Sequence, residues 1–121
     1  MFKITVETMF RAAHSLGLAD GLKEPEHAHD WSVAAEVGAA ELDRNGLVMD
    51  FCQLRRALDA VVAPLQEEGF EAVAYFRGNN SSAENVARYV FENLEPRLPE
   101  GVELLGVVVG EARGCCARFE K

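Results

Sequence analysis

Apolar and polar residues alternate over two long segments in the first third of the chain. Apolar residues occupy the even positions from 2 to 12 except Thr8, and in a second segment they occupy odd positions from 31 to 39. A period of two is typical of a strand with one buried face. The sequence therefore predicts two long, half-buried strands, joined by a turn-rich segment at 17–25.

Two helices are predicted in the middle of the chain. Apolar residues recur at helical spacing from 51 to 65, after the cap-like pair Asp50 and Gln53 and before Gly69. Ser81 to Glu84 matches a capping box, and a second helical pattern runs from there to the breaker Pro96. Residues 70–80 fit neither period, so we predict a loop there with a short extended piece.

Two further strands are predicted at 102–109 and 115–119, around a turn at 112–114. The element order is therefore strand, strand, helix, helix, strand, strand. This order predicts an α+β fold in which both helices pack on one face of a four-stranded antiparallel sheet. A length of 121 residues suits a single domain spanning 1–121. The exposed edges of such a sheet favour assembly between subunits.

The composition argues against some classes of binding partner. Twelve basic against twenty acidic residues give a net charge of −8, which opposes binding to nucleic acid or to an anionic membrane. No segment approaches the roughly 20 apolar residues of a membrane span, and the first residues lack the apolar region of a signal peptide. We expect a soluble, cytoplasmic protein. Cys52 is expected to be a small buried hydrophobe, and the adjacent pair Cys115 and Cys116 matches no disulfide or CxxC metal pattern.

The only three histidines are His14, His27 and His29. His14 continues the apolar parity of the first strand, and the other two share the apolar parity of the second. All three side chains are therefore expected on the core side, where a hairpin would bring them together. Three imidazoles without a fourth protein ligand describe an open zinc site, completed by water or substrate. The alternative is that each is an unrelated surface or partly buried side chain.

Five short segments occur in a fixed order along the whole chain. They are Phe10–His14, His27–His29, Gly46–Phe51, Ser82–Asn85 and Glu111. Together they resemble the 6-pyruvoyl-tetrahydropterin synthases and the bacterial 6-carboxy-tetrahydropterin synthases. The resemblance implies the tunnelling fold (T-fold), whose subunits form oligomeric barrels, here expected as a homo-hexamer that is a dimer of trimers.

The resemblance also implies a site. A Zn²⁺ ion would be bound by His14, His27 and His29, and the amide and amino groups of a pterin by Glu111. A carboxylate suits that task because its two oxygens accept a pair of N–H bonds. Ser81 and Ser82 match positions where the family often has hydroxyls near the pterin, although helix capping also explains them.

The chain departs from the family pattern at two catalytic positions. The cysteine base expected four residues before the His-x-His pair is Lys23, and the expected Asp-His dyad falls at Gln66–Glu67. Glu24, however, resembles the glutamate of a Glu-x-x-His-Gly-His branch that uses glutamate in place of cysteine. That branch converts dihydroneopterin triphosphate to 6-hydroxymethyl-dihydropterin. Glu24 is therefore a candidate base, unless it and Glu26 simply belong to an acidic surface loop.

Three functions remain compatible with the sequence. The first is a zinc-dependent lyase, breaking a carbon-oxygen or carbon-carbon bond in the side chain of a dihydroneopterin triphosphate. The second is a catalytically degenerate homologue that still binds a pterin, and the third is a purely structural oligomer. Because the cysteine and the dyad are missing, whether the protein is an enzyme stays open at this stage.

Overall fold

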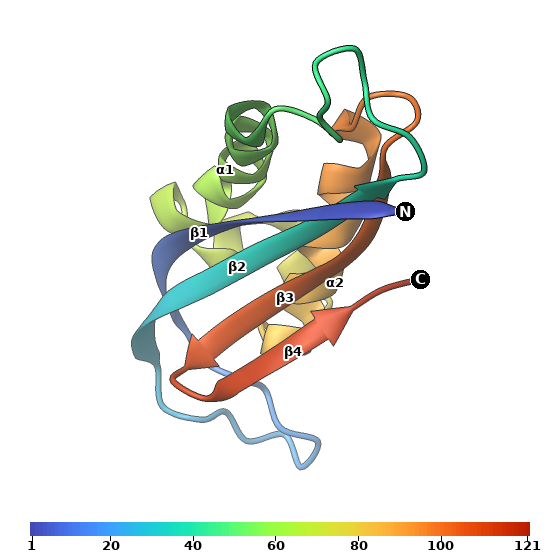
Figure 1. The fold of residues 1–121 in the computed structure, drawn as a ribbon. Coiled ribbons are helices and arrows are strands. Elements are labelled where there is room, and N and C mark those ends of the chain that lie inside the picture. Colours follow the sequence, from blue (N-terminus) through green and yellow to red (C-terminus); the bar gives the residue numbers. More distant parts are fainter.

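The computed structural model describes residues 1–121 and contains one four-stranded antiparallel sheet with two helices on one face (Figure 1). The strands follow one another across the sheet in chain order: β1 (Phe2–His14), β2 (His27–Ala39), β3 (Glu103–Ala112) and β4 (Cys115–Phe119). The helices are α1 (Phe51–Glu67) and α2 (Ala83–Leu94), with short 3₁₀ helices η1 (Phe70–Ala72), η2 (Ala74–Arg77) and η3 (Glu95–Arg97). The predicted α+β architecture and element order are confirmed.

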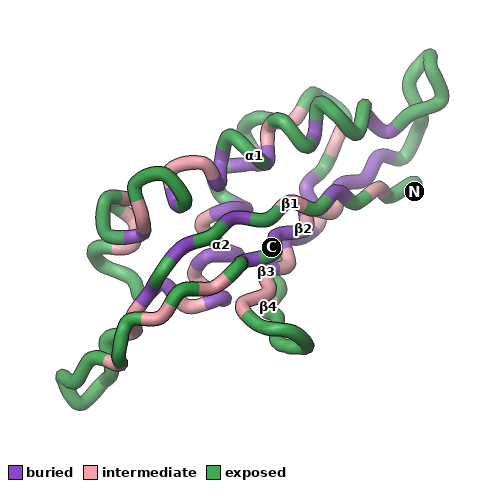
Figure 2. Tube along the Cα trace, turned by 90° about the vertical axis from the view of Figure 1, so that its left-hand side faces the viewer, coloured by how far each residue is buried: buried purple, intermediate pink, exposed green.

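The core lies between the sheet and the two helices. Figure 2 shows the buried stretches of the strands facing those of the helices. Alternate residues of β2 and every third or fourth residue of α1 are fully or almost fully buried, among them Trp31, Val33, Leu54, Leu58 and Leu65. Burying one such leucine side chain stabilises a fold by about 1.5–3 kcal/mol. The two periodicities of the sequence are therefore what holds the helices on this face.

The register between β1 and β2 decides the geometry at the sheet end where these strands are joined. His14 pairs with His27, Ala12 pairs with His29, and the pairing runs without a bulge along both strands. Directly opposed residues project to the same side of an antiparallel pair. The prediction that the three histidines share the core-facing side is therefore confirmed.

Both helices begin at a capping side chain. Asp50 accepts hydrogen bonds from the backbone N–H groups of Cys52 and Gln53, as the sequence predicts. Ser82 caps α2 by accepting from the N–H of Asn85, so the predicted cap at Ser81 is wrong by one residue. The expectation of a buried Cys52 is also wrong: its thiol is exposed, since the second residue of α1 lies outside the apolar stripe.

The segment after α1 differs from the predicted loop with an extended piece. Gly69, with a φ of 84°, turns the chain away from α1, and two 3₁₀ helices follow. Phe70 anchors this segment because its ring is buried against Phe10 and Trp31. Short 3₁₀ turns satisfy their hydrogen bonds locally, so they leave no periodic apolar pattern long enough to recognise.

Strands β1 and β4 form the two edges of the sheet. β1 is thirteen residues long, whereas β4 has five. Neither edge is paired within the chain, as the sequence predicts. Among the helices, none is both long and apolar enough to cross a membrane.

Candidate metal centre

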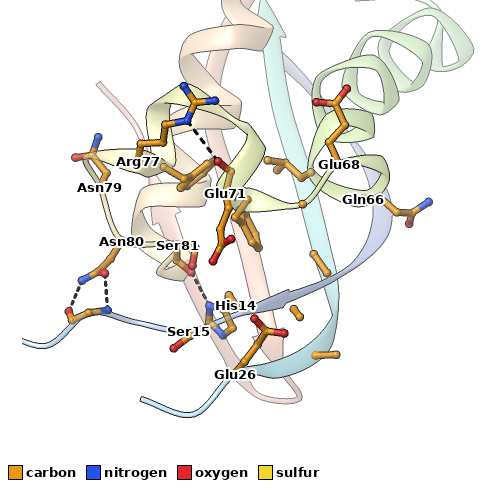
Figure 3. Close-up of a pocket in the computed structure, with 18 of the residues that line it drawn as sticks. His14, Ser15, Glu26, Gln66, Glu68, Glu71, Arg77, Asn79, Asn80 and Ser81 are labelled. Carbon is orange, nitrogen blue, oxygen red and sulfur yellow. Dashed lines mark hydrogen bonds between the residues drawn. The ribbon is translucent and has the colours of Figure 1, made fainter. Parts of the chain in front are cut away.

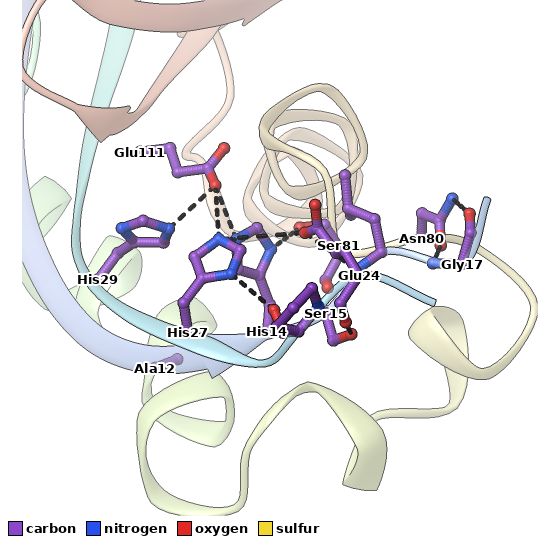
Figure 4. A network of polar contacts seen from close by, with 12 residues as sticks. Ala12, His14, Ser15, Gly17, Glu24, His27, His29, Asn80, Ser81 and Glu111 are labelled. Atoms are coloured by element: carbon purple, nitrogen blue, oxygen red, sulfur yellow. Dashed lines mark hydrogen bonds and ion pairs between the residues drawn. The ribbon is translucent and has the colours of Figure 1, made fainter. Parts of the chain in front are cut away.

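The three histidines converge at the end of the β1–β2 ladder. The side chain of His14 is fully buried, whereas those of His27 and His29 are 40% and 24% exposed. Glu111, near the end of β3, joins them, and one ligand atom from each of the four residues lies within 4.8 Å of the others. The histidines are therefore brought together as the strand parity predicts, and Figure 4 shows all four side chains pointing toward one another.

Backbone carbonyls orient two of the imidazole rings. His14 Nδ1 donates to the carbonyl of Ser81 at 2.7 Å, and His27 Nδ1 donates to the carbonyl of Pro25 at 3.0 Å. In a neutral ring with Nδ1 protonated, Nε2 carries a lone pair. The two Nε2 atoms nevertheless lie 3.0 Å apart, an arrangement that is repulsive unless a cation lies between them.

The surroundings of His27 favour positive charge. The Pro25 carbonyl that accepts from Nδ1 is the main cause that raises the pKa of His27 above its ordinary value. Burial lowers this pKa, and the carboxylates of Glu24 and Glu111 raise it. The same groups would stabilise a metal cation at Nε2. A ring held by an outer hydrogen bond in this way is typical of a metal-binding histidine.

His29 Nε2 is the buried atom that most needs a partner. It has no hydrogen bond, although Glu111 Oε1 lies 3.1 Å away, because the contact lacks hydrogen-bond geometry. Leaving a buried polar atom without a partner costs about 1–3 kcal/mol. A metal ion coordinated by Nε2 would satisfy it.

Glu111 contributes an oxygen that the three-histidine pattern does not predict. Its Oε1 lies 2.7, 3.1 and 3.7 Å from the Nε2 atoms of His14, His29 and His27, respectively. The sequence predicts an open site without a fourth protein ligand. The structure places a fourth potential donor atom, Glu111 Oε1, beside the three Nε2 atoms, because β3 lies next to β2 and finishes at the same end of the sheet.

The spacing of these atoms suits zinc. Four donors held about 2.0–2.1 Å from a zinc ion in a regular tetrahedron lie about 3.3 Å from one another. Four of the six distances among these atoms run from 2.7 to 3.7 Å and straddle that value, and the remaining two are no longer than 4.8 Å. Imidazole nitrogen with carboxylate oxygen is also a donor set that zinc accepts. The residues present therefore fit the metal.

Glu24 lies at the margin of this group. Its Oε1 is 4.0 Å from His27 Nε2 and accepts a hydrogen bond from the N–H of Leu16 at 3.1 Å. The hydroxyl of Ser15 donates to the Glu24 carbonyl, which fixes the backbone there as well. Its side chain is 29% exposed, so Glu24 is a held, partly buried carboxylate rather than a free surface acid.

A cavity of about 800 Å³ lies beside the group, along β1 and the segment from the end of α1 to Ser81 (Figure 3). Among the predicted site residues, it is lined by His14 and Ser81. His27, His29 and Glu111 belong to the same group of four as His14 but do not line that cavity. Their side chains are partly exposed. Ser82, which caps α2, does not line the cavity either.

The supporting contacts around His14 are those that sequence reasoning missed. The indole of Trp31 lies edge-on to the His14 ring at 4.8 Å, and its N–H donates to the carbonyl of Ala12. Two of the orienting acceptors, at Ser81 and Pro25, are backbone carbonyls, which any residue would supply. Trp31 is the member with a recognisable signal, since it shares the odd parity of His27 and His29.

The family model described as 6-pyruvoyl tetrahydropterin synthase matches residues 3–121. The chain belongs to the 6-pyruvoyl tetrahydropterin synthase family. The human 6-pyruvoyl tetrahydrobiopterin synthase is 33% identical over 78 residues, which cover 63% of this chain and 54% of the human protein. The match thus spans about half the length of that relative.

Other relatives cover more of the chain. The dihydroneopterin monophosphate aldolase of Pyrococcus furiosus is 28% identical over 102 residues, covering 84% of this chain and 82% of that protein. The 6-pyruvoyl tetrahydropterin synthase structure of Caenorhabditis elegans superposes with a TM-score of 0.76 at 24% identity, covering 100% and 97% of the two chains. That of Plasmodium falciparum gives 0.79 at 18% identity, covering 99% and 97%. At these identities the structures show the shared T-fold alone.

Two positions depart from the family's pattern in the structure as in the sequence. Lys23 lies on the cavity wall, with its ammonium 3.9 Å from a Glu71 oxygen and most of its side chain exposed. Gln66 accepts a hydrogen bond from the N–H of Arg11, which ties the end of α1 to β1. Neither position provides a thiolate or an imidazole, and the chain holds no further histidine.

Proposed function

We propose that this member of the family is a zinc-dependent lyase that cleaves the side chain of a dihydroneopterin phosphate and releases 6-hydroxymethyl-dihydropterin. The observation that carries the proposal is the convergence of three imidazole Nε2 atoms, with the Glu24 carboxylate 4.0 Å from one of them. His14, His27 and His29 would hold the metal. When bound, a zinc ion supplies a Lewis acid that polarises an oxygen of the substrate side chain.

Glu24 is proposed as the base. It removes the proton from the hydroxyl on the second side-chain carbon, whose oxygen becomes a carbonyl as the bond between the first and second carbons breaks. The bonding electrons pass from the first carbon into the adjacent ring C=N bond. The first carbon then takes up a proton, which leaves a hydroxymethyl group on the ring and releases a phosphorylated two-carbon aldehyde. The hydrogen bond from Leu16 N–H keeps one carboxylate oxygen oriented for this role.

The absence of the usual cysteine base and Asp-His dyad is consistent with this reaction. One proton leaves an oxygen and one returns to carbon, so a single carboxylate can both accept and donate it. A synthase reaction that moves protons on opposite faces of the substrate needs a second proton-transfer group, the Asp-His dyad. Gln66–Glu67 stands at that position in this chain. A Plasmodium vivax synthase of the same fold, at 17% identity, has a glutamate described as a catalytic residue, so a catalytic carboxylate is compatible with this fold.

Glu111, Ser81 and Ser82 are proposed to contact the pterin. Glu111 is 28% exposed, so its second oxygen can reach a ligand that approaches the site. Ser81 is buried next to His14. The hydroxyl of Ser82 already caps α2, so it is the weakest of the three candidates.

The candidate substrates differ in the number of phosphates that they carry. The proposal from the sequence motif is the triphosphate, whereas the Pyrococcus furiosus relative is named for the monophosphate. Both compounds carry the same hydroxyls on the first and second side-chain carbons, so the step above applies to both. We therefore propose the shared dihydroneopterin phosphate chemistry as the substrate class.

The deciding experiment is turnover with product identification. Zinc-loaded protein is incubated separately with dihydroneopterin monophosphate and triphosphate, and the pterin products are separated by chromatography. The expected product is 6-hydroxymethyl-dihydropterin from at least one of them, and Glu24→Gln should form it far more slowly. Unchanged substrate at high protein concentration would refute the lyase.

The second candidate is a pterin-binding homologue without synthase or lyase activity. The observation that favours it is the replacement of both usual catalytic positions by Lys23 and Gln66–Glu67. It is distinguished by a binding measurement with an unreactive oxidised pterin such as neopterin. Binding without turnover supports this candidate, and turnover excludes it.

Assembly is proposed to follow the family, as a hexamer built by pairing of the free edges of β1 and β4 between subunits. Sedimentation velocity tests it directly. A mass near six chains is expected, and a monomer at micromolar concentration would contradict it. Neither nucleic acid nor membrane is proposed as a partner, and the cytoplasm remains the predicted location.

A further inference from the structure

We propose that Glu111 is the fourth metal ligand of the resting protein and that it leaves the metal when a pterin binds. The first half of this proposal, that Glu111 is a fourth ligand, concerns the metal alone. The second half rests on the proposed function, because it uses the same carboxylate as the pterin contact.

The position of Glu111 Oε1 carries the first half. One carboxylate oxygen approaches three Nε2 atoms at once, at 2.7, 3.1 and 3.7 Å, and all three contacts involve that same oxygen. A hydrogen-bonding carboxylate would align with one N–H donor. Here the Nδ1 atoms of His14 and His27 are the donors, to backbone carbonyls, so their Nε2 atoms have no proton to offer when the rings are neutral. When His29 has the same tautomer, the group presents four lone-pair donors around a point, which describes a closed coordination sphere.

The alternative partners of this carboxylate are few. Within the chain, Glu111 makes no ion pair with a lysine or arginine, and its polar contacts are the three histidines. Four acceptor atoms this close, one of them negatively charged, would repel one another without a cation at their centre. The same metal that satisfies His29 Nε2 also explains why Glu111 points inward.

A closed sphere has a consequence for catalysis. Sites with four protein ligands are structural, whereas catalytic zinc keeps one position for water or substrate. For the proposed lyase to act, one ligand must leave. Glu111 is the ligand proposed to leave because it lies near the end of β3, whereas His14 and His27 are each held through Nδ1 and His29 lies within the β1–β2 ladder. A pterin that offers N–H groups would compete with the metal for the Glu111 carboxylate.

The test uses the full chain loaded with Co²⁺, whose visible absorption changes with coordination number and ligand type. Wild type is compared with Glu111→Gln, with Glu111→Asp, and with the control Glu26→Gln, a neighbouring carboxylate outside the group of four. Zinc affinity is measured in parallel by competition with a chromophoric chelator, and circular dichroism verifies that each variant is folded.

The expected result is that Glu111→Gln weakens zinc binding by about tenfold or more and changes the Co²⁺ spectrum, whereas Glu26→Gln changes neither. Glu111→Asp, which keeps the charge on a shorter side chain, should lie between them. Wild-type affinity and spectrum in folded Glu111→Gln would overturn the fourth-ligand assignment.

The exchange is tested by adding neopterin to the same samples. The wild-type Co²⁺ spectrum should shift toward that of Glu111→Gln, and the spectrum of the variant should shift little further. Neopterin binding, followed by quenching of the single Trp31, without a spectral change would overturn the exchange. Absence of any neopterin binding would refute the pterin-binding function instead, while leaving the metal result intact.

Discussion

The Nε2 atoms of His14 and His27 face each other at 3.0 Å while both Nδ1 atoms donate to backbone carbonyls. The two carbonyls belong to Ser81 and Pro25, which lie in different segments of the chain. The fold therefore fixes both rings from behind and leaves their lone pairs directed at one point. This relationship identifies the group as a place for a cation more strongly than the presence of three histidines does.

Metal removal is expected to lower the stability of the protein. A ligand present at about 100 times its Kd stabilises the folded state by about 2.7 kcal/mol, which corresponds to roughly 10 °C in the unfolding midpoint of a domain of this size. Thermal unfolding of zinc-loaded and chelator-treated protein measures the difference. His14→Ala is the control, because it should give one midpoint under both conditions. Equal midpoints for the wild type would argue against a zinc site.

Replacing Glu24 by glutamine is expected to remove the base and keep the metal. The kcat for cleavage of a dihydroneopterin phosphate should fall by about 10²–10⁴-fold, the usual contribution of a general base. Zinc content, measured by elemental analysis, should stay at one per chain. Glu26→Gln, two residues along the same segment, should retain activity. If both variants were equally active, Glu24 would be an ordinary acid of the loop.

The N-cap of α1 gives a test of the fold that is independent of the site. Asp50→Ala should lower the free energy of unfolding by about 1 kcal/mol, because the N–H groups of Cys52 and Gln53 lose their acceptor. Urea titration of the zinc-loaded protein measures this change. Glu67→Ala, at the exposed other end of the helix, is the control and should be nearly neutral. A neutral Asp50→Ala would mean that water replaces the cap without cost.

Much of the fold is encoded in periodic patterns, which is why the sequence predicts it. Parity along β1 and β2 is enough to put His14, His27 and His29 on one side, because the register has no bulge between these strands. The prediction of a loop with an extended piece after Gly69 is wrong, because the segment forms two short 3₁₀ helices. Its conformation depends on the tertiary burial of Phe70 rather than on a local repeat.

The candidate site is only partly predictable for a related reason. The place of Glu111 beside the histidines depends on β3 pairing with β2, a contact between residues far apart in the chain. Its place among the candidate metal ligands therefore follows from the three-dimensional arrangement of the strands. The orienting carbonyls of Ser81 and Pro25 carry no side-chain signature at all, so no motif could reveal them.

Asn80 is expected to hold the loop that carries Glu24. Its side chain bonds twice to Gly17, accepting from the N–H and donating to the C=O, each at 2.8 Å. Asn80→Ala should release the Gly17 amide, so that its hydrogen exchange accelerates, and should lower kcat while zinc affinity is unchanged. Asn79→Ala is the matched control, since the Asn79 side chain bonds only to the carbonyl of Tyr75. Equal Gly17 protection in both variants would show that the loop is held by its own backbone contacts, which join Leu16 to Glu24 and Leu18 to Leu22.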